Sequence, residues 1–138
     1  MLMDHAVERI ETAIKANSEA DIIAPSMKTF GTSNEQIILT KDPKLEDFRS
    51  GNRIGYCCAI RKSKLLEVGG YSPRMQEGYE DLALTCLLLS RGSKIVTIPE
   101  PLWLYRTKDE SMWTKAREHH QELLDQINKD IPEAKLNF

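Results

Sequence analysis

Apolar positions recur at helical spacing near the start of the chain and then give way to a β-branched run. Val7, Ile10 and Ile14 fall on one stripe of the segment Asp4–Asn17, which predicts an amphipathic helix. The residues that follow, Asp21–Pro25, are short, β-branched and closed by proline, as in a buried strand. The chain therefore opens on a helix and a strand.

The next third alternates short apolar runs with turn residues. Met27–Leu39 has strand character on both sides of a Gly-Thr-Ser-Asn turn at 31–34. Asp42–Arg49 is polar and is interpreted as a short helix or a loop, with Pro43 suited to a first helical turn. The run IGYCCAI at Ile54–Ile60 predicts another strand.

Two helices are predicted in the middle of the chain. Ser63 is a suitable N-cap for a short helix through Val68, and Gly69-Gly70 would end it. Tyr79–Ser90 is apolar on nearly every side, which is typical of a helix buried between layers, and the cation and glycine of Arg91-Gly92 close it.

The last third returns to strands and ends in a helix. Lys94–Ile98 predicts a strand, Pro99–Pro101 a turn, Leu102–Tyr105 a second extended segment, and Trp113–Asn128 a helix. Helices that alternate with short apolar strands indicate an α/β fold, a short mixed sheet flanked by helices, in which residues 1–138 form one domain.

Composition narrows the classes of protein. The 138 residues carry 19 basic and 21 acidic side chains, a net charge of −2 that gives no reason to expect a nucleic-acid partner. Three cysteines do not make a disulfide framework, so a reducing, cytoplasmic setting is expected. The longest apolar stretch, Leu82–Leu89, is too short to span a bilayer. A peripheral position at the inner face of the cell membrane is compatible with this.

The candidate chemistry lies where the buried helix begins. Glu80 and Asp81 are adjacent acids after a glycine-aromatic turn, and no other charge follows until Arg91. One interpretation is favourable pairing with the helix dipole, worth roughly 0.3–1 kcal/mol for each acid. The other is a carboxylate projected into a cleft by a rigid helix.

The order of several motifs resembles a known family. An apolar strand leads to RKSKLLEVGGY, then to GYEDLAL, then to IPEPLWLYR, with a serine at Ser111. The opening MLMDHAVERIETAIKANSEADIIAP matches the helix and strand that follow the metal-binding Asp-x-Asp in the same family. This order resembles the second, C-terminal half of family-two glycosyltransferases of the GT-A fold.

The resemblance implies a hexosyltransferase-type enzyme. It would move a sugar from a nucleoside-diphosphate sugar to a hydroxyl of a carbohydrate or glycolipid acceptor, in polysaccharide or glycoconjugate synthesis. Asp81 would be the general base, and Glu80 would orient or bind the acceptor. Further acceptor contacts implied by the resemblance are Tyr79, Asn52, Trp103 and Arg106. For Trp103, packing is the competing interpretation.

The donor-binding half of the family pattern is missing. No Asp-x-Asp occurs in the sequence, and Lys108 stands near the place where the family often has a histidine. A divalent metal, Mg²⁺ or Mn²⁺, is therefore expected in a full-length enzyme but not in this chain, which we expect to be inactive alone. The alternative is a non-catalytic binding or scaffolding module that kept the fold.

Three further expectations concern surfaces and side chains. Without the first half, the strand Asp21–Pro25 would have an unpaired edge, which predicts a homodimer unless Trp113–Asn128 covers it. Cys57-Cys58 are expected to be core thiols on a strand, and His119-His120 to lie at a surface or edge.

Overall fold

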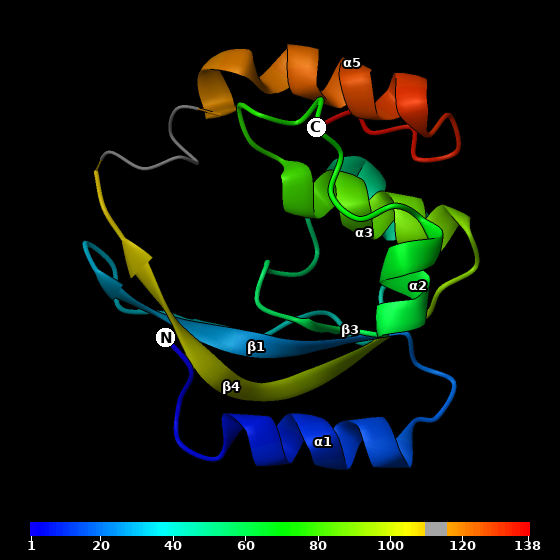
Figure 1. Cartoon of the computed structure of the whole chain (residues 1–138). Coiled ribbons are helices and arrows are strands. Elements are labelled where there is room, and N and C mark those ends of the chain that lie inside the picture. The colour runs from blue at the N-terminus through cyan, green and yellow to red at the C-terminus, as the bar shows by residue number, and fades with distance from the viewer. Residues whose placement is uncertain (110–115) are drawn as a thin grey trace.

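The computed structural model describes residues 1–109 and 116–138. The sheet lies between α1 on one side and α3 and α5 on the other (Figure 1). In chain order the elements are α1 (Ala6–Ala16), β1 (Ile22–Gly31), β2 (Gln36–Ile37), η1 (Leu45–Ser50), β3 (Ala59–Ile60), α2 (Lys62–Glu67), α3 (Glu80–Ser90), β4 (Ile95–Thr107), η2 (Arg117–His119) and α5 (His120–Asp130). The predicted α/β class, a short mixed sheet flanked by helices, is confirmed.

Strand β1 is the interior strand of the sheet. β4 pairs with it in parallel along its whole length, from Ile22 with Ile95 to Gly31 with Thr107. The short strands β2 and β3 pair antiparallel with two separate parts of β1. Because β4 occupies one edge throughout, β2 and β3 must share the other edge. The prediction that Asp21–Pro25 is an unpaired edge is therefore wrong.

The outer side of β4 is partly covered by the N-terminal residues. Leu2 forms a bridge with Trp103, the Met3 N–H donates to the Leu102 carbonyl at 2.9 Å, and the Leu104 N–H donates to the Met1 carbonyl at 2.7 Å. A terminal segment thus lies along this edge, but it is not the last helix. The homodimer was predicted from the edge of Asp21–Pro25 and stays a prediction without that basis; light scattering would test it.

The two extended segments predicted around residues 94–105 form a single strand with a bulge. The register moves from Pro25 opposite Ile98 to Ser26 opposite Pro101. Prolines have no N–H to donate, so the carbonyls at the bulge need other partners. The buried hydroxyl of Ser26 donates to the Ile98 carbonyl at 3.0 Å, and the Trp103 indole N–H donates to the Pro25 carbonyl at 3.2 Å.

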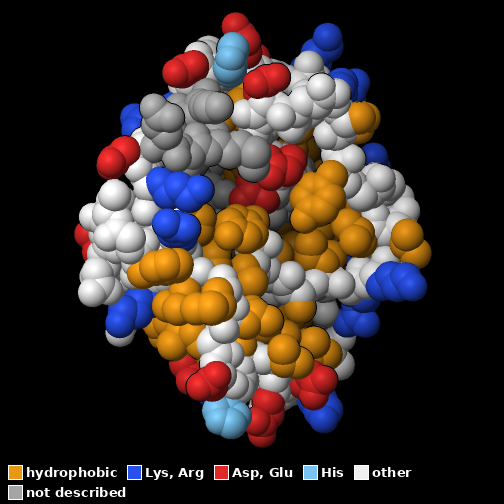
Figure 2. Space-filling view, turned by 60° about the vertical axis from the view of Figure 1, so that its left-hand side comes forward, with side chains coloured by type: hydrophobic (Ala, Val, Ile, Leu, Met, Phe, Trp, Pro, Cys, Tyr) orange, Lys and Arg blue, Asp and Glu red, His pale blue; other side chains and the backbone are white. Residues whose placement is uncertain are grey.

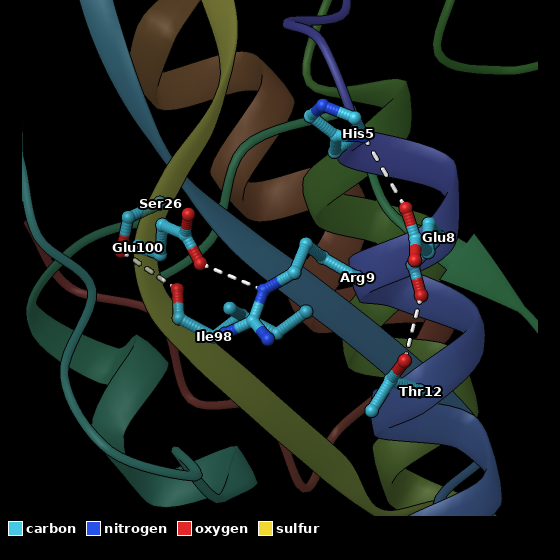
Figure 3. Close-up of polar contacts among 7 residues, drawn as sticks. All are labelled: His5, Glu8, Arg9, Thr12, Ser26, Ile98 and Glu100. Atoms are coloured by element: carbon cyan, nitrogen blue, oxygen red, sulfur yellow. Dashed lines mark hydrogen bonds and ion pairs between the residues drawn. The ribbon is translucent and has the colours of Figure 1, made fainter.

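Alternate residues of β1 face two different cores. Ile22 and Ala24 contact the larger cluster, which is shared with α3, α5 and the C-terminal tail. Ile23 belongs to a smaller cluster with Ala6 of α1 and Leu102 of β4. The period of two along the strand produces this division. At the surface, Arg9 Nε of α1 donates to Glu100 Oε2 at the bulge at 2.9 Å (Figure 3).

Some element boundaries differ from the sequence predictions. Only Ala59–Ile60 of the predicted strand Ile54–Ile60 is paired. The preceding backbone packs closely against a ring, since a Cβ at Gly55 would lie 2.6 Å from Trp103 Cζ2. Ser63 lies inside α2 and does not cap it.

Two further sequence predictions concern the last helix and a membrane span. The helical part described for the last segment begins at η2, and Trp113 and Ser111 lie outside the described residues. Within the described residues, no helix is both long and apolar enough to cross a bilayer.

Candidate functional site

The start of α3 presents the acidic pair from a fixed support. The helix behind it buries Leu82, Leu84 and Leu88 in the larger core, each at 2% exposure or less. The residue before the helix, Tyr79, has φ 59°, a left-handed conformation that costs a non-glycine residue roughly 1–2 kcal/mol. Asp81 Oδ1 accepts the Leu82 N–H at 2.8 Å.

Asp81 lies at the wall of a cavity of about 620 Å³. Its lining residues come from the loop before β3, the start of α3, the end segment η2–α5 and the C-terminal tail. Among the described residues they are Asn52, Tyr79, Asp81, Leu82, Arg117, His120 and Phe138. The site thus joins residues that are far apart in the sequence, and its size suits a small ligand.

The electrostatics of the cavity favour a carboxyl that holds a proton more tightly than usual. Burial raises the pKa of Asp81, and the nearby charge of Glu80 adds to the rise. Hydrogen bonds from the Leu82 N–H and from the Asn52 side chain act in the opposite direction. A base with a raised pKa accepts a proton more readily, which is what a general base near neutral pH requires.

The structure brings together three of the residues predicted for the site. Asn52, Tyr79 and Asp81 line the same cavity. Glu80 is half-buried in the first turn of α3, next to Asp81 and not among the lining residues. Arg106 is exposed near the end of β4, opposite Phe30 in the ladder, and also does not line the cavity.

The predicted acceptor contact of Trp103 is corrected by its burial. The side chain is 1% exposed, and its N–H is used by the Pro25 carbonyl. An indole in this position fills the core at the β4 bulge and offers no free ring face to a sugar. Its neighbour Tyr56, with ring centroids 5.0 Å apart in an edge contact, is 56% exposed.

Two exposed tyrosines near the acids were not predicted from the sequence. Tyr56 and Tyr71 are 56% and 54% exposed. Burial raises the pKa of each, and the negative charge of Asp81 contributes to the rise in both. Figure 2 shows a face on which acidic side chains lie in a hollow bordered by hydrophobic side chains.

His120 was also missed as a site residue. The Tyr79 hydroxyl lies 2.7 Å from His120 Nδ1, and His120 Nε2 is hydrogen-bonded to the backbone oxygen of Phe138. His119 is exposed, as expected for both histidines, whereas His120 is half-buried. Its partners are 41 and 18 residues away, so no local pattern could have identified it.

A close backbone approach joins the start of α3 to the last segment. Gly78 has φ 131°, and a Cβ added there would lie 2.6 Å from the Cβ of Ala116. Only glycine fits both this conformation and this approach. The segment that contains Ala116 and His120 is therefore packed directly against the turn that precedes α3.

The cysteines are buried or half-buried. All three are free, and Cys57 and Cys58 are half-buried outside any strand. Burial raises the pKa of Cys58 to about 12, so its thiolate is strongly disfavoured. In the two described ranges, no three His, Cys, Asp or Glu side chains are grouped so that they could hold a metal ion.

The chain is similar in structure to a known nucleotide-sugar-binding protein. No protein-family model matches the sequence, and no curated protein matches it. Among solved structures, it matches S. aureus TarS 1–349, solved in complex with UDP-GlcNAc, with a TM-score of 0.69 and 14% identity. The match covers 99% of this chain and 41% of TarS 1–349. At this identity the match shows the fold alone, and it spans less than half of the neighbour's length.

Proposed function

We propose that this chain is the acceptor-side part of a glycosyltransferase that uses a nucleoside-diphosphate sugar, with Asp81 as its general base. The observation that carries the proposal is the position of Asp81, at the head of a buried helix and on the wall of a 620 Å³ cavity. The order of sequence motifs and the fold shared with a protein that binds UDP-GlcNAc support it.

In the proposed reaction, an acceptor hydroxyl attacks the anomeric carbon of the donor sugar. Asp81 takes the hydroxyl proton as the new C–O bond forms, and the bond to the nucleoside diphosphate breaks with its electron pair leaving on the phosphate oxygen. Attack from the opposite side gives inversion. A general base of this kind contributes roughly 10²–10⁴ in rate.

Side chains around Asp81 have separate parts in this proposal. Asn52 and Tyr79 contact the acceptor from the cavity wall, and Glu80 shapes the charge beside Asp81. The exposed rings of Tyr56 and Tyr71 stack on the acceptor sugar, which is the contact that the sequence suggested for Trp103. Exposed aromatic faces near the base can stack on a sugar ring. Arg106, outside the cavity, would contact only an acceptor that extends along β4.

The family resemblance also implies Mg²⁺ or Mn²⁺ at the donor phosphates. Such an ion would stabilise the charge on the leaving nucleoside diphosphate. The described residues of this chain do not group into a set of ligands for it, so no step above depends on a metal held here. We propose that a further part of a longer protein, or a partner chain, binds the donor and the metal. We also propose that the enzyme acts in the cytoplasm.

The test is a transfer assay with a panel of nucleotide sugars on a protein that includes both parts. Asp81→Asn should lower turnover by roughly 10²-fold or more, since amides cannot accept the proton. Glu8→Gln is the matched control, because Glu8 lies in the first turn of α1 with a 75% exposed side chain. Wild-type turnover in Asp81→Asn would contradict the role of Asp81.

A second candidate function is a binding module without catalysis. The observation that favours it is coverage: the chain spans 41% of TarS 1–349. Calorimetry on the chain alone, with uridine and guanosine diphosphate sugars and manganese, should show no binding heat under the main proposal. Micromolar binding of a nucleotide sugar would mean that this chain holds a donor site of its own.

A further inference from the structure

A chain of hydrogen bonds leads from the cavity to the C-terminal tail. Tyr79 and His120 face each other with ring centroids 5.7 Å apart and edge-to-face, and His120 meets the ring of Phe138 in the same way at 5.4 Å. The Tyr79 hydroxyl contacts one ring nitrogen of His120, and the Phe138 backbone oxygen contacts the other. Both nitrogens of the imidazole are therefore engaged.

For a neutral His120, the chemistry of these partners sets the direction of each bond. A backbone oxygen only accepts, so His120 Nε2 must carry the proton that is shared with Phe138. In a neutral imidazole the other nitrogen, Nδ1, then has a lone pair and accepts. The Tyr79 O–H must donate to it, which uses the one proton of this hydroxyl.

A tyrosine held in this way can only accept from a ligand. Its remaining lone pairs lie at the wall of the cavity that Asp81 also lines. An ionised carboxylate likewise only accepts. Tyr79 and Asp81 are two residues apart and line the same cavity. Burial raises the pKa of Tyr79, Arg117 lowers it, and the charge of Asp81 adds to the rise. The hydroxyl therefore keeps its proton near neutral pH.

We propose that His120 is a positioning residue that fixes the Tyr79 hydroxyl as a hydrogen-bond acceptor beside Asp81, so that the cavity takes ligands with two neighbouring hydroxyl groups. This proposal rests on the proposed function in one respect: it names the polyol or sugar diol as the class of acceptor. One hydroxyl would donate to Asp81, and the adjacent one to Tyr79.

The backbone supports the same arrangement. The left-handed Tyr79 and the close contact of Gly78 with Ala116 set the tyrosine against the segment that carries His120. The residues that hold Tyr79 thus come from the end of the chain, and those that hold Asp81 are Leu82 of α3 and Asn52 of the loop before β3. A ligand diol would join the two.

The first measurement is the tautomer of His120. In ¹⁵N-histidine-labelled protein at neutral pH, we expect a protonated, pyrrole-like Nε2 and an unprotonated, pyridine-like Nδ1. His119 is the internal control, because it is exposed and should show the free mixture of forms. A protonated Nδ1 in His120 would overturn the assignment, since Tyr79 would then be free to donate.

The second measurement is a titration with sorbitol, which carries a hydroxyl on each carbon, against per-O-methylated sorbitol, which has none to donate. Sorbitol should move the His120 and Asp81 resonances, and its methylated form should not. Tyr79→Phe should weaken sorbitol binding by about 3- to 10-fold, as expected for one hydrogen bond. Tyr105→Phe is the matched control, because Tyr105 packs on Trp103 and does not line the cavity.

In the titration, three results would overturn the proposal: no response to sorbitol in wild-type protein, an equal response to both probes, or unchanged binding in Tyr79→Phe. His120→Asn, which keeps a polar group but changes its position, should lower affinity to the same extent as Tyr79→Phe. Neither measurement requires sugar transfer, so a failure of the proposed enzyme activity would leave this result readable, and the reverse is also true.

Discussion

Helices α1 and α3 begin in the same way and have different chemistry. Each is 11 residues long, and each follows a non-glycine residue in the left-handed conformation, His5 at φ 60° and Tyr79 at φ 59°. Neither has a side-chain cap, and both carry acid in the first turn. In α1 that acid is Glu8, exposed and 3.3 Å from the exposed His5 (Figure 3). In α3 one of the two acids is Asp81, which is half-buried and has a raised pKa.

The difference lies in what surrounds each helix start. α1 packs one stripe against the sheet and turns its polar face, with Glu8, to solvent. α3 is apolar on nearly every side beyond its first turn, and η2, α5 and the C-terminal tail close around that turn. The same local geometry is therefore a surface feature in one place and the wall of a cavity in the other. An acidic helix start becomes a candidate base only when other elements remove it from water.

The largest loss of stability is expected at the close contact between Gly78 and Ala116, beside the start of α3. Gly78→Ala should lower the free energy of unfolding by about 3 kcal/mol, because the new Cβ meets Ala116 at 2.6 Å and φ is 131°. Gly69→Ala separates the two causes: φ is 82° there but nothing lies within 4 Å, so about 1 kcal/mol is expected. Equal losses in urea unfolding would show that the Ala116 contact has no energetic weight.

The same substitution at the two left-handed helix starts, His5 and Tyr79, should change stability in opposite directions. Tyr79→Gly should lower stability by about 2 kcal/mol, because relief of backbone strain is smaller than the loss of packing and of the His120 hydrogen bond. His5→Gly should raise stability by about 1 kcal/mol, since His5 is exposed and loses only its contact with Glu8. Chemical denaturation measures both, and a gain in Tyr79→Gly would contradict the enclosed state of this helix start.

The pH dependence of stability should separate the two acids. The folded-state pKa of Asp81 is raised above its ordinary value of 3.8, so the folded protein binds its proton more tightly than the unfolded chain. The stability that this group contributes is present at pH values below its ordinary pKa. It is lost as the pH rises through the raised pKa of the folded state. Asp81→Asn should therefore raise the melting temperature at neutral pH and have no such effect in acid. Glu8→Gln should show no comparable gain.

The smallest effect is expected where α1 meets the bulge of β4. Arg9 and Glu100 form an ion pair with side chains that are 52% and 51% exposed. Water and salt screen such a pair, so Arg9→Ala should cost less than about 1 kcal/mol, and less still in high salt. A larger, salt-independent loss in thermal unfolding would mean that the bulge depends on α1.

The sequence predicts the elements whose signals are local. The stripe in α1, the turn after β1 and the apolar run of α3 depend on residues within one or two turns of each other, and the structure contains all three elements. The acids Glu80 and Asp81 were placed at the start of α3 for the same reason. Gly69-Gly70 end α2 with φ 82° and 77°, conformations that favour glycine.

Predictions that needed distant partners were the ones that failed or were incomplete. The interior position of β1, the continuous β4 and the unpaired run before β3 follow from pairings across more than 30 residues. The role of Trp103 depends on a carbonyl 78 residues away, and that of His120 on a hydroxyl 41 residues away. Side-chain type and spacing do not indicate which distant atom will lie within hydrogen-bond distance of a side chain.

The amino-acid sequence by itself determined the helices, the central strand and the place of the acidic pair, because periodicity, glycine and charge act over a few residues. The tertiary structure alone decided that Asp81 is half-buried at a cavity, that the Tyr79 hydroxyl lies 2.7 Å from His120 Nδ1, and that Trp103 fills the core. The physical reason is that burial and hydrogen-bond partners are properties of the packed layers and not of any one segment.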